Sequence, residues 1–398
     1  MTHAPSGSPS SSQRIRVLLM ISSMRGGGSE RQTLLLLKHL DRQVFEPHLY
    51  MTEAEGCLLA EVPQDVVIHS YQPSDAASGF YFPGRILRDQ TRHLLSVLDA
   101  ARIDVIYDRT FHMTMLAGSA ATSRSIPRVS TIVSPPERAV PMVEKRFVQI
   151  KKRRLAKAYR QSTSVIAVSQ QAAASAVHYY GLSPEDVVVV ANPVDVDEVT
   201  SQSAASVSVS RSANAITFIC VGRMTAEKGQ RNLIEALSLL ESDTNVPSLE
   251  VWFVGDGPLR VDVENLARRT LSRHQVRFLG HQDNAPAWIA SADALILPSL
   301  FEGMPNVVLE AMAIGKPVIA TRAGGTVELQ RDEPTMFMAE PGNPTSIAAA
   351  IRTYCDNPEL IEQHVDAAKR LIDEHHNISK NVNRIETIMK DAANLRRT

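Results

Sequence analysis

The stretch EGMPNVVLEAMAIGKPVIA, from Glu302 to Ala320, carries the clearest structural pattern in the chain. Pro305 suits the first position of a helix, and Gly315 suits the C-terminal end of the same helix. The apolar run Val318–Ala320 then predicts a short buried strand. A helix that is followed at once by a buried strand is typical of an α/β fold, in which helices cover parallel sheets.

Glu302 and Glu310 have side chains suited to a sugar site. Glu302 falls just before the predicted helix N-terminus, and Glu310 falls within the helix. An ionised carboxylate has two oxygens that only accept hydrogen bonds, so it suits two neighbouring sugar hydroxyls. Free amides at the helix N-terminus, around Gly303, Met304 and Pro305, attract anionic groups. The alternative is structural: one acid stabilises the helix start, and the other lies on a solvated face.

Length and composition restrict the class of protein. The chain has 398 residues, which fits two domains of roughly 180 residues each. Its 44% hydrophobic and 21% charged residues are typical of a globular protein. The net charge of -1 argues against a general nucleic-acid binder.

The cysteines and the N-terminal residues indicate the cellular compartment of the protein. Cys57, Cys220 and Cys355 lie far apart and form no CxxC pair. We therefore expect reduced core thiols in a cytosolic protein, with no zinc site and no disulfide. Residues 1–13 are rich in Ser and Pro, which predicts a disordered segment that lacks the apolar core of a signal peptide. No apolar run approaches the roughly 20 residues that span a bilayer, so any membrane contact is expected to be peripheral.

Short apolar runs alternate with helical patterns in both halves of the chain, which predicts parallel sheets covered by helices. Strands are predicted at Ile15–Ile21, Pro47–Met51, Asp104–Tyr107, Arg128–Ile132, Ser164–Val168, Val187–Val190, Ala215–Val221, Leu249–Val254, Val276–Leu279, Ala294–Leu297 and Pro317–Ala320. Helices are predicted at Thr33–Leu40, Asn232–Leu240, Leu259–Leu271 and Asp283–Ala290. A Ser-rich linker, 196–214, is expected to join an N-terminal domain, 14–195, to a C-terminal domain, 215–375, with helical residues 376–398 at the end.

A glycine-rich loop, Gly26–Gly28, follows the first predicted strand. Glycines let the backbone approach a ligand closely and direct its amides at an anion, although a tight strand-to-helix turn is the simpler reading. Ser29 and Gln32 have the spacing of a capping box at the start of the next helix. A dinucleotide fingerprint fits poorly, because its third glycine would fall at Arg31.

Two cations follow a strand in the second half. The predicted strand that ends at Val221 runs into Gly222, Arg223 and, five residues after Arg223, Lys228. Open α/β sheets bind ligands at the carboxyl ends of their strands. Arg223 could bind phosphate oxygens bidentately, and Lys228 supplies a compact charge. The alternative is that both cations belong to surface ion pairs.

Five motifs follow one another along the chain: Gly27–Glu30, Asn192–Asp195, Gly222–Gly229, Gly255–Pro258 and Glu302–Glu310. Together they resemble the motifs of retaining glycosyltransferases with the GT-B fold, specifically the large GT4 group. The resemblance implies two Rossmann-like, doubly wound domains that face each other across a cleft. It also implies a C-terminal helix that crosses back onto the N-terminal domain.

The same resemblance implies roles for the C-terminal residues, which would hold a nucleotide-sugar. Arg223 and Lys228, beside Gly222, would bind the diphosphate and stabilise the charge that develops on it. Glu310 would bind the nucleotide ribose. Glu302 would face the hydroxyls of the transferred sugar, and with the two cations it forms the expected catalytic set.

Other residues would complete the donor site. By resemblance, Gly27 and Gly28 would close over the diphosphate, and Phe278 belongs to a turn near the base. The backbone of Gly303–Pro305 would contact the sugar. We expect no metal and no cofactor, since cations and amides can stabilise the leaving group. Asp195-Val196-Asp197 imitates a metal-binding Asp-x-Asp motif, but its place in an Asn-Pro-Val-Asp turn favours coincidence.

The acceptor side is less defined. Many members of the group carry a histidine after the fourth N-terminal strand, where His112 is the nearest candidate and a core histidine is the alternative. The basic stretch 144–160 could contact an anionic membrane or guide a lipid-diphosphate acceptor, or could simply be a core-packed helix with a solvated basic face. The aromatic loop 79–83 could be an interfacial tip or a packed loop. We expect a cytoplasmic enzyme, peripheral at most at the inner face of the cell membrane.

The expected reaction is transfer of a sugar, with retained configuration, from a UDP- or GDP-sugar to a glycan or lipid-linked acceptor. This would serve the synthesis of cell-surface polysaccharide or glycolipid. Alternatives are a sucrose- or glucan-type synthase of the same fold, and an inactive protein that still binds nucleotide-sugar. A nicotinamide oxidoreductase is disfavoured by the glycine spacing.

Overall fold

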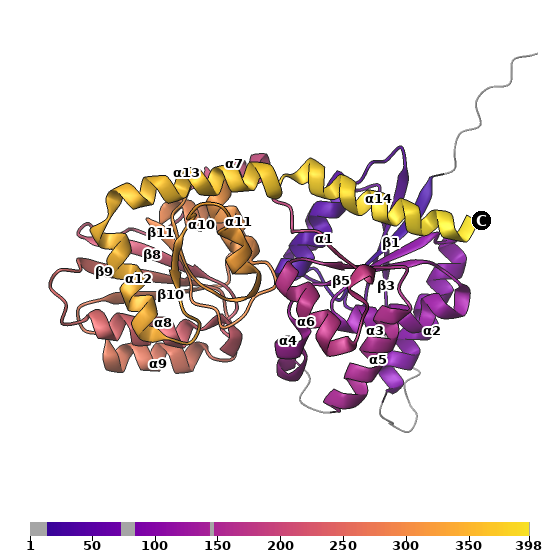
Figure 1. The fold of residues 1–398 in the computed structure, drawn as a ribbon, viewed down its shortest axis with the longest axis horizontal. Helices are drawn as coiled ribbons and strands as arrows, with labels where there is room; N and C mark the ends of the chain where they lie inside the picture. Colours follow the sequence, from indigo (N-terminus) through magenta and orange to yellow (C-terminus); the bar gives the residue numbers. More distant parts are fainter. Residues whose placement is uncertain (1–13, 73–83, 144–146, 398) are drawn as a thin grey trace, which may run out of the picture.

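The computed structural model describes residues 14–72, 84–143 and 147–397 of the chain. Figure 1 shows two α/β halves side by side, with helices α13 (Pro358–His375) and α14 (Ile378–Arg397) running along one edge of both. The segments 1–13 and 79–83, and the basic residues Lys145 and Arg146, lie outside the described residues.

The first half contains a seven-stranded parallel sheet in the order β3-β2-β1-β4-β5-β6-β7. Its strands are β1 (Ile15–Ile21), β2 (Phe45–Met51), β3 (Val67–Ser70), β4 (Val105–Arg109), β5 (Arg128–Ile132), β6 (Ser164–Ala167) and β7 (Val187–Val189). Its helices are α1 (Gly28–His39), α2 (Arg85–Ala101), α3 (Phe111–Arg124), α4 (Pro136–Val143), α5 (Val148–Arg160), α6 (Gln170–Tyr180) and the 3₁₀ helices η1 (Cys57–Glu61) and η2 (Pro184–Asp186).

Both faces of this sheet are buried, as expected for a parallel sheet. Alternate residues of β1 enter different hydrophobic clusters. Leu19 packs in the cluster that includes Leu37 of α1 and Met389 of α14, whereas Leu18 packs in the cluster that includes Leu94 of α2 and Leu116 of α3. Helices therefore cover the sheet on both sides.

The second half contains a six-stranded parallel sheet in the order β10-β9-β8-β11-β12-β13. Its strands are β8 (Ala215–Val221), β9 (Ser248–Val254), β10 (Gln275–Gly280), β11 (Ala294–Leu297), β12 (Val318–Thr321) and β13 (Phe337–Ala339). Its helices are α8 (Gln230–Leu240), α9 (Arg260–Thr270), α10 (Ala285–Ser291), α11 (Asn306–Ala313), α12 (Pro344–Asp356), α13 and the 3₁₀ helices η3 (Ala226–Lys228) and η4 (Gly324–Leu329).

The predicted α/β architecture with two doubly wound sheets is confirmed, and so is the return of the C-terminal helix. Helix α13 packs on α11, whereas α14 packs on α1 and on the sheet of the first half. At the crossing, Val194 pairs with Asn377 in an isolated parallel bridge. His376 Nδ1 lies 2.8 Å from the carbonyl oxygen of Asn192. The chain therefore passes between the halves twice at one place.

Three local expectations differ from the structure. The segment predicted as a linker begins with a helix, α7 (Val196–Ser203), which packs on α10 and α11. Asp195 starts that helix, because its carboxylate accepts from the Glu198 amide at 3.0 Å. Helix α1 begins at Gly28 with Gly27 as its N-cap, so Ser29 and Gln32 form no capping box. Pro305 caps α11, whose first residue is Asn306, one position later than predicted.

The cysteines also differ from the expectation of core thiols. Cys220 is buried, Cys355 is partly exposed and Cys57 is exposed. Among the described residues, no helix is both long and apolar enough to cross a membrane.

Candidate active site

A lysine and a glutamate from different loops meet beside the second sheet. Lys228 lies in the loop after β8, and Glu302 lies in the loop after β11, which neighbours β8 in the sheet. Lys228 Nζ lies 2.7 Å from Glu302 Oε1, and the Ser299 hydroxyl donates to the same oxygen at 2.7 Å. Glu302 is buried and Lys228 is half-buried. The lysine charge is therefore held at the carboxyl ends of adjacent strands, where α/β sheets bind ligands.

Arg223 lies in the same loop as Lys228. Its carbonyl oxygen accepts from Gln230 Nε2 at 2.9 Å, which fixes the backbone. Its side chain is exposed, and within the described part of the chain no hydrogen bond or ion pair holds the guanidinium. Gly222 precedes it, and a Cβ there would lie 3.7 Å from Lys228 Cδ. The loop thus offers one paired and one unpaired cation.

The backbone after Glu302 is closely surrounded. A Cβ on Gly303 would lie 1.9 Å from the carbonyl oxygen of Val133, in the first half of the chain. A Cβ on Gly324 would lie 1.7 Å from the carbonyl oxygen of Glu302, and Gly324 has φ +60°. Only glycine permits these approaches without displacing backbone. The glutamate loop is therefore held between the η4 loop and the first half.

Asparagine and glutamine side chains join the two halves beside the glycine-rich loop. Asn306, at the start of α11, donates from Nδ2 to the Gly28 carbonyl oxygen at 3.0 Å. Its Oδ1 accepts from Asn192 Nδ2 at 2.8 Å and from Gln32 Nε2 at 3.4 Å. Gln32 also donates to the Pro193 carbonyl oxygen at 3.0 Å. Gly28 thus lies against the N-terminus of α11, the helix that follows the loop carrying Glu302.

Glu310 lines a cavity of about 70 Å³ between the halves, together with Arg31, Gln32 and Asn306. Burial raises the pKa of the Glu310 carboxyl to about 7, and the positive charge of Arg31 opposes the shift. A perturbed carboxyl in a cavity is a candidate for ligand binding. The cavity is smaller than a nucleotide, so a ligand would also need the open space around it.

Two family models match the chain. The model described as Glycosyl transferases group 1 matches residues 215–357, and the model described as Glycosyltransferase Family 4 matches residues 26–198. The chain belongs to glycosyltransferase family 4.

The relatives of this family 4 chain include an enzyme of lipopolysaccharide core biosynthesis. It is 36% identical over 151 residues to the lipopolysaccharide core biosynthesis glycosyltransferase LpsD of Rhizobium meliloti, covering 38% of this chain and 42% of LpsD. It is 28% identical over 185 residues to an Escherichia coli UDP-Gal:alpha-D-GlcNAc-diphosphoundecaprenol alpha-1,3-galactosyltransferase, covering 45% of this chain and 46% of that protein. The matched region thus spans less than half the length of these curated relatives.

The fold is also that of two solved structures. Anabaena HepE in complex with UDP and glucose superposes with a TM-score of 0.75 at 22% identity, covering 95% of this chain and 100% of HepE. WaaG, a glycosyltransferase involved in lipopolysaccharide biosynthesis, superposes with a TM-score of 0.70 at 17% identity, covering 93% of this chain and 99% of WaaG. These likenesses support the GT-B architecture.

The other predicted donor residue, Phe278, lies at the end of β10 in this family 4 chain. Its ring stacks on Phe253, with centroids 5.0 Å apart and planes 10° from parallel. Its carbonyl oxygen accepts from Arg260 Nη2 at 3.3 Å. One face of the ring packs on the core, and a contact between Phe278 and a base stays a prediction.

On the acceptor side, His112 lies in the first turn of α3. Its Nε2 is 3.0 Å from Gln90 Oε1. Burial lowers the pKa of His112, and the charge of Lys151 adds to that effect. The structure therefore gives this histidine a side-chain partner from α2, and its catalytic role stays a prediction.

Several residues of the site were not predicted. Glu328, in η4, accepts from the backbone amides of Gln170 and Gln171 at 3.0 Å each, so a carboxylate of the second half caps helix α6 of the first. Ser299 and Asn306 were also missed. A serine three residues before a glutamate carries no distinctive sequence signal, whereas Asn306 directly follows the predicted helix start.

Proposed function

We propose that this chain is a retaining glycosyltransferase that moves a sugar from a UDP- or GDP-sugar to a glycan or lipid-linked acceptor, without a metal ion. The observation that carries the proposal is the Lys228–Glu302 pair, with the exposed side chain of Arg223 in the same loop as Lys228. The cations would bind the diphosphate, and the glutamate would orient the sugar. The printed names of the relatives, which include lipopolysaccharide core synthesis, a UDP-Gal donor and a diphosphoundecaprenol acceptor, support this reaction class.

The mechanism follows from where charge develops. As the bond between sugar and diphosphate breaks, positive charge grows on the sugar ring and negative charge on the leaving phosphate. Lys228 is already oriented by Glu302, so it needs little reorganisation to stabilise that phosphate. Arg223 can form two parallel hydrogen bonds to phosphate oxygens. The N-terminus of α11, where Asn306 and Val307 are half-buried, adds backbone amides to the same region.

The direct test offers the purified chain a panel of nucleotide-sugars. Thermal shift and slow hydrolysis identify the donor, and lipid-linked saccharides are then supplied as acceptors. We expect transfer with retention of the anomeric configuration, observed by NMR of the product, in the presence of a chelator. Inverted product would contradict the retaining assignment, and absence of any donor binding would contradict the proposed function.

Glu310 is expected to govern nucleotide binding, and it gives the first variant test. Its raised pKa means that the carboxyl is mostly protonated below about pH 7, when it accepts hydrogen bonds from ribose hydroxyls less well. Free-nucleotide affinity should therefore rise with pH through 7, by at most about tenfold per unit. Glu310→Gln should bind more weakly and lose this pH dependence, as measured by calorimetry between pH 6 and pH 8.

Glu302→Ala is the contrast. It should bind free nucleotide nearly as well as the parent protein and lose chiefly the added affinity for the nucleotide-sugar. Identical losses on both ligands for the two variants would contradict the assignment.

The Glu310→Gln variant is expected to fold. A carboxyl whose pKa is raised in the folded state destabilises that state as the pH rises past the unfolded pKa of about 4.3. Replacing this carboxyl with a neutral amide removes that destabilisation.

The basic helix α5 supports the proposed contact with an anionic membrane. One face packs in the core through Leu155 and Tyr159, as the alternative of a core-packed helix predicts. The other face exposes Arg153 and Arg154, and Ile150 remains 49% exposed beside them. A cationic surface with an apolar side chain suits weak binding to anionic lipid.

Liposome co-sedimentation tests this contact. We expect binding to anionic vesicles at low salt, weakened roughly 30-fold in Arg153→Ala/Arg154→Ala, since each cation near such a surface contributes about 1 kcal/mol. Arg231→Ala, which removes an exposed cation from α8 in the other half, is the matched control. No co-sedimentation of the parent protein even at low salt would remove the idea.

A further inference from the structure

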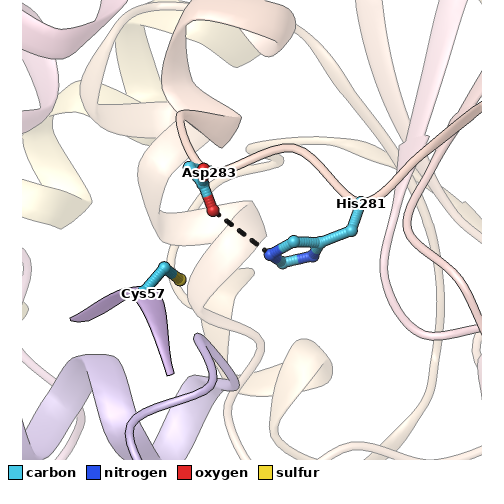
Figure 2. A group of neighbouring side chains, drawn as sticks. All are labelled: Cys57, His281 and Asp283. Atoms are coloured by element: carbon cyan, nitrogen blue, oxygen red, sulfur yellow. Dashed lines mark ion pairs between the residues drawn. The ribbon is translucent and has the colours of Figure 1, made fainter. Parts of the chain in front are cut away.

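Three side chains with metal-binding atoms meet between the two halves, beside Gly26 of the glycine-rich loop. Cys57 begins η1 in the first half, whereas His281 and Asp283 lie in the loop after β10 in the second half. Figure 2 shows the imidazole and the carboxylate facing each other, with the thiol beside them. One atom of each residue, a sulfur, a ring nitrogen and a carboxylate oxygen, lies within 4.8 Å of the other two. All three residues are exposed, so an ion could reach them from solvent.

The spacing is close to that of a tetrahedral ion. Zinc binds sulfur at about 2.3 Å and nitrogen or oxygen at about 2.0 to 2.1 Å, so the donor atoms of one tetrahedral site lie roughly 3.3–3.6 Å apart. His281 Nε2 and Asp283 Oδ1 are 3.4 Å apart. Because the sulfur lies within 4.8 Å of both other atoms, the exposed Cys57 side chain would have to approach them by at most about 1.5 Å.

The backbones that carry the three side chains are fixed by other contacts. Gly56 has φ +120°, and a Cβ there would lie 2.1 Å from the Met24 carbonyl oxygen, so the turn before Cys57 packs tightly on the first half. The Asp283 carbonyl oxygen accepts from Arg31 Nη2 at 2.8 Å, across the two halves. An ion would therefore join two loops that already lie side by side.

We propose that Cys57, His281 and Asp283 bind one divalent cation of the zinc class and thereby hold the two halves together. Thiolate and imidazole favour zinc over magnesium or calcium, and a fourth position is left for water. Binding exchanges the thiol proton, which is released to solvent, for a sulfur–metal bond. The ion holds the halves in place, and none of its ligands is a residue assigned to the donor sugar.

Cobalt titration of the full chain tests the site, because Co²⁺ occupies such sites and a cobalt–thiolate bond absorbs in the near ultraviolet. We expect one equivalent of Co²⁺ to bind with this absorption and to be displaced by Zn²⁺. Cys57→Ser should abolish the absorption, whereas Cys355→Ser, which removes the other partly accessible cysteine, should retain it. Absence of the band in the parent protein, or its persistence in Cys57→Ser, would overturn the proposal.

The bridge between the halves has its own test. Cys57→Ser in the first half and His281→Gln in the second should each weaken Zn²⁺ binding by roughly 100-fold, measured by competition with a chromophoric chelator. Since both ligate one ion, each single variant should weaken the same single equivalent of Zn²⁺, and the double variant should bind no more tightly than either single variant. An equivalent that either single variant retains at the affinity of the parent protein would mean that Cys57 and His281 do not share one ion and would refute the bridge. Neither readout depends on sugar transfer, so failure of the proposed function would leave this test intact.

Discussion

Lys228→Ala is expected to lower turnover by roughly 10²–10³ while the protein stays folded. A unit charge about 4 Å from its partner contributes roughly 4 kcal/mol at an effective dielectric near 20. About 1.4 kcal/mol corresponds to tenfold in rate, and the remaining cation and amides retain part of the stabilisation. Arg223→Ala should cause a loss of the same order, because both cations are assigned to the diphosphate. Steady-state kinetics with the donor identified in the panel would measure both variants.

The matched control is Arg231→Ala. Arg231 is an exposed cation on α8, in the same half, and pairs with Glu235 one turn along the helix. Exposed pairs of this kind contribute little, so its turnover should stay within twofold of the parent. Rates within threefold of the parent for both Arg223→Ala and Lys228→Ala would refute the proposed roles.

Gly303→Ala is the second variant with a large expected effect. The added methyl would lie 1.9 Å from the Val133 carbonyl oxygen, which belongs to the other half of the molecule. The halves can relieve this clash by moving apart, so each half should keep its own fold. The loop after Glu302 would then lose its position against the first half. We expect turnover to fall at least about 100-fold, since misplacing a site by about 1 Å has that effect.

Gly324→Ala separates this effect from ordinary destabilisation. Its methyl would lie 1.7 Å from the Glu302 carbonyl oxygen, within one half, at a residue with φ +60°. That clash cannot be relieved by separating the halves, so the unfolding temperature should drop. For Gly303→Ala, calorimetry should show an unfolding temperature within a few degrees of the parent. Full turnover in Gly303→Ala would show that transfer does not need the observed approach.

Much of the fold follows from patterns local in the sequence. Every predicted strand is present within a few residues, because parallel strands buried on both faces are nearly continuous apolar runs. Two strands, β3 and β13, were not predicted. At the sheet edge, β3 leaves Val67 46% exposed, and β13 is only three residues long, Phe337–Ala339. Both strands lie at the edge of their sheet, and their apolar runs, Val66–Ile68 and Met336–Ala339, are short.

The site was harder to predict because its contacts are long-range. The motifs placed Lys228 and Glu302 near strand ends, but their direct pairing depends on β8 and β11 being neighbours in the sheet. For Gln32 the sequence predicted a local contact where the structure has long-range ones. Its spacing from Ser29 suggested a local cap, whereas the structure uses its amide to reach Pro193 and Asn306. Cys57 likewise gains its neighbours, His281 and Asp283, only when the halves come together.

The double passage of the chain between the halves has a mechanical consequence. The bridge between Val194 and Asn377 joins the two crossing segments at one edge of the molecule, where α13 ends and α14 begins (Figure 1). A rigid-body rotation of one half would therefore have its axis near these two residues, and displacements would grow with distance from it. Two fluorophores, one on each half and far from this axis, would show the largest change in separation when the halves rotate. A pair placed beside Asn377 would show little change.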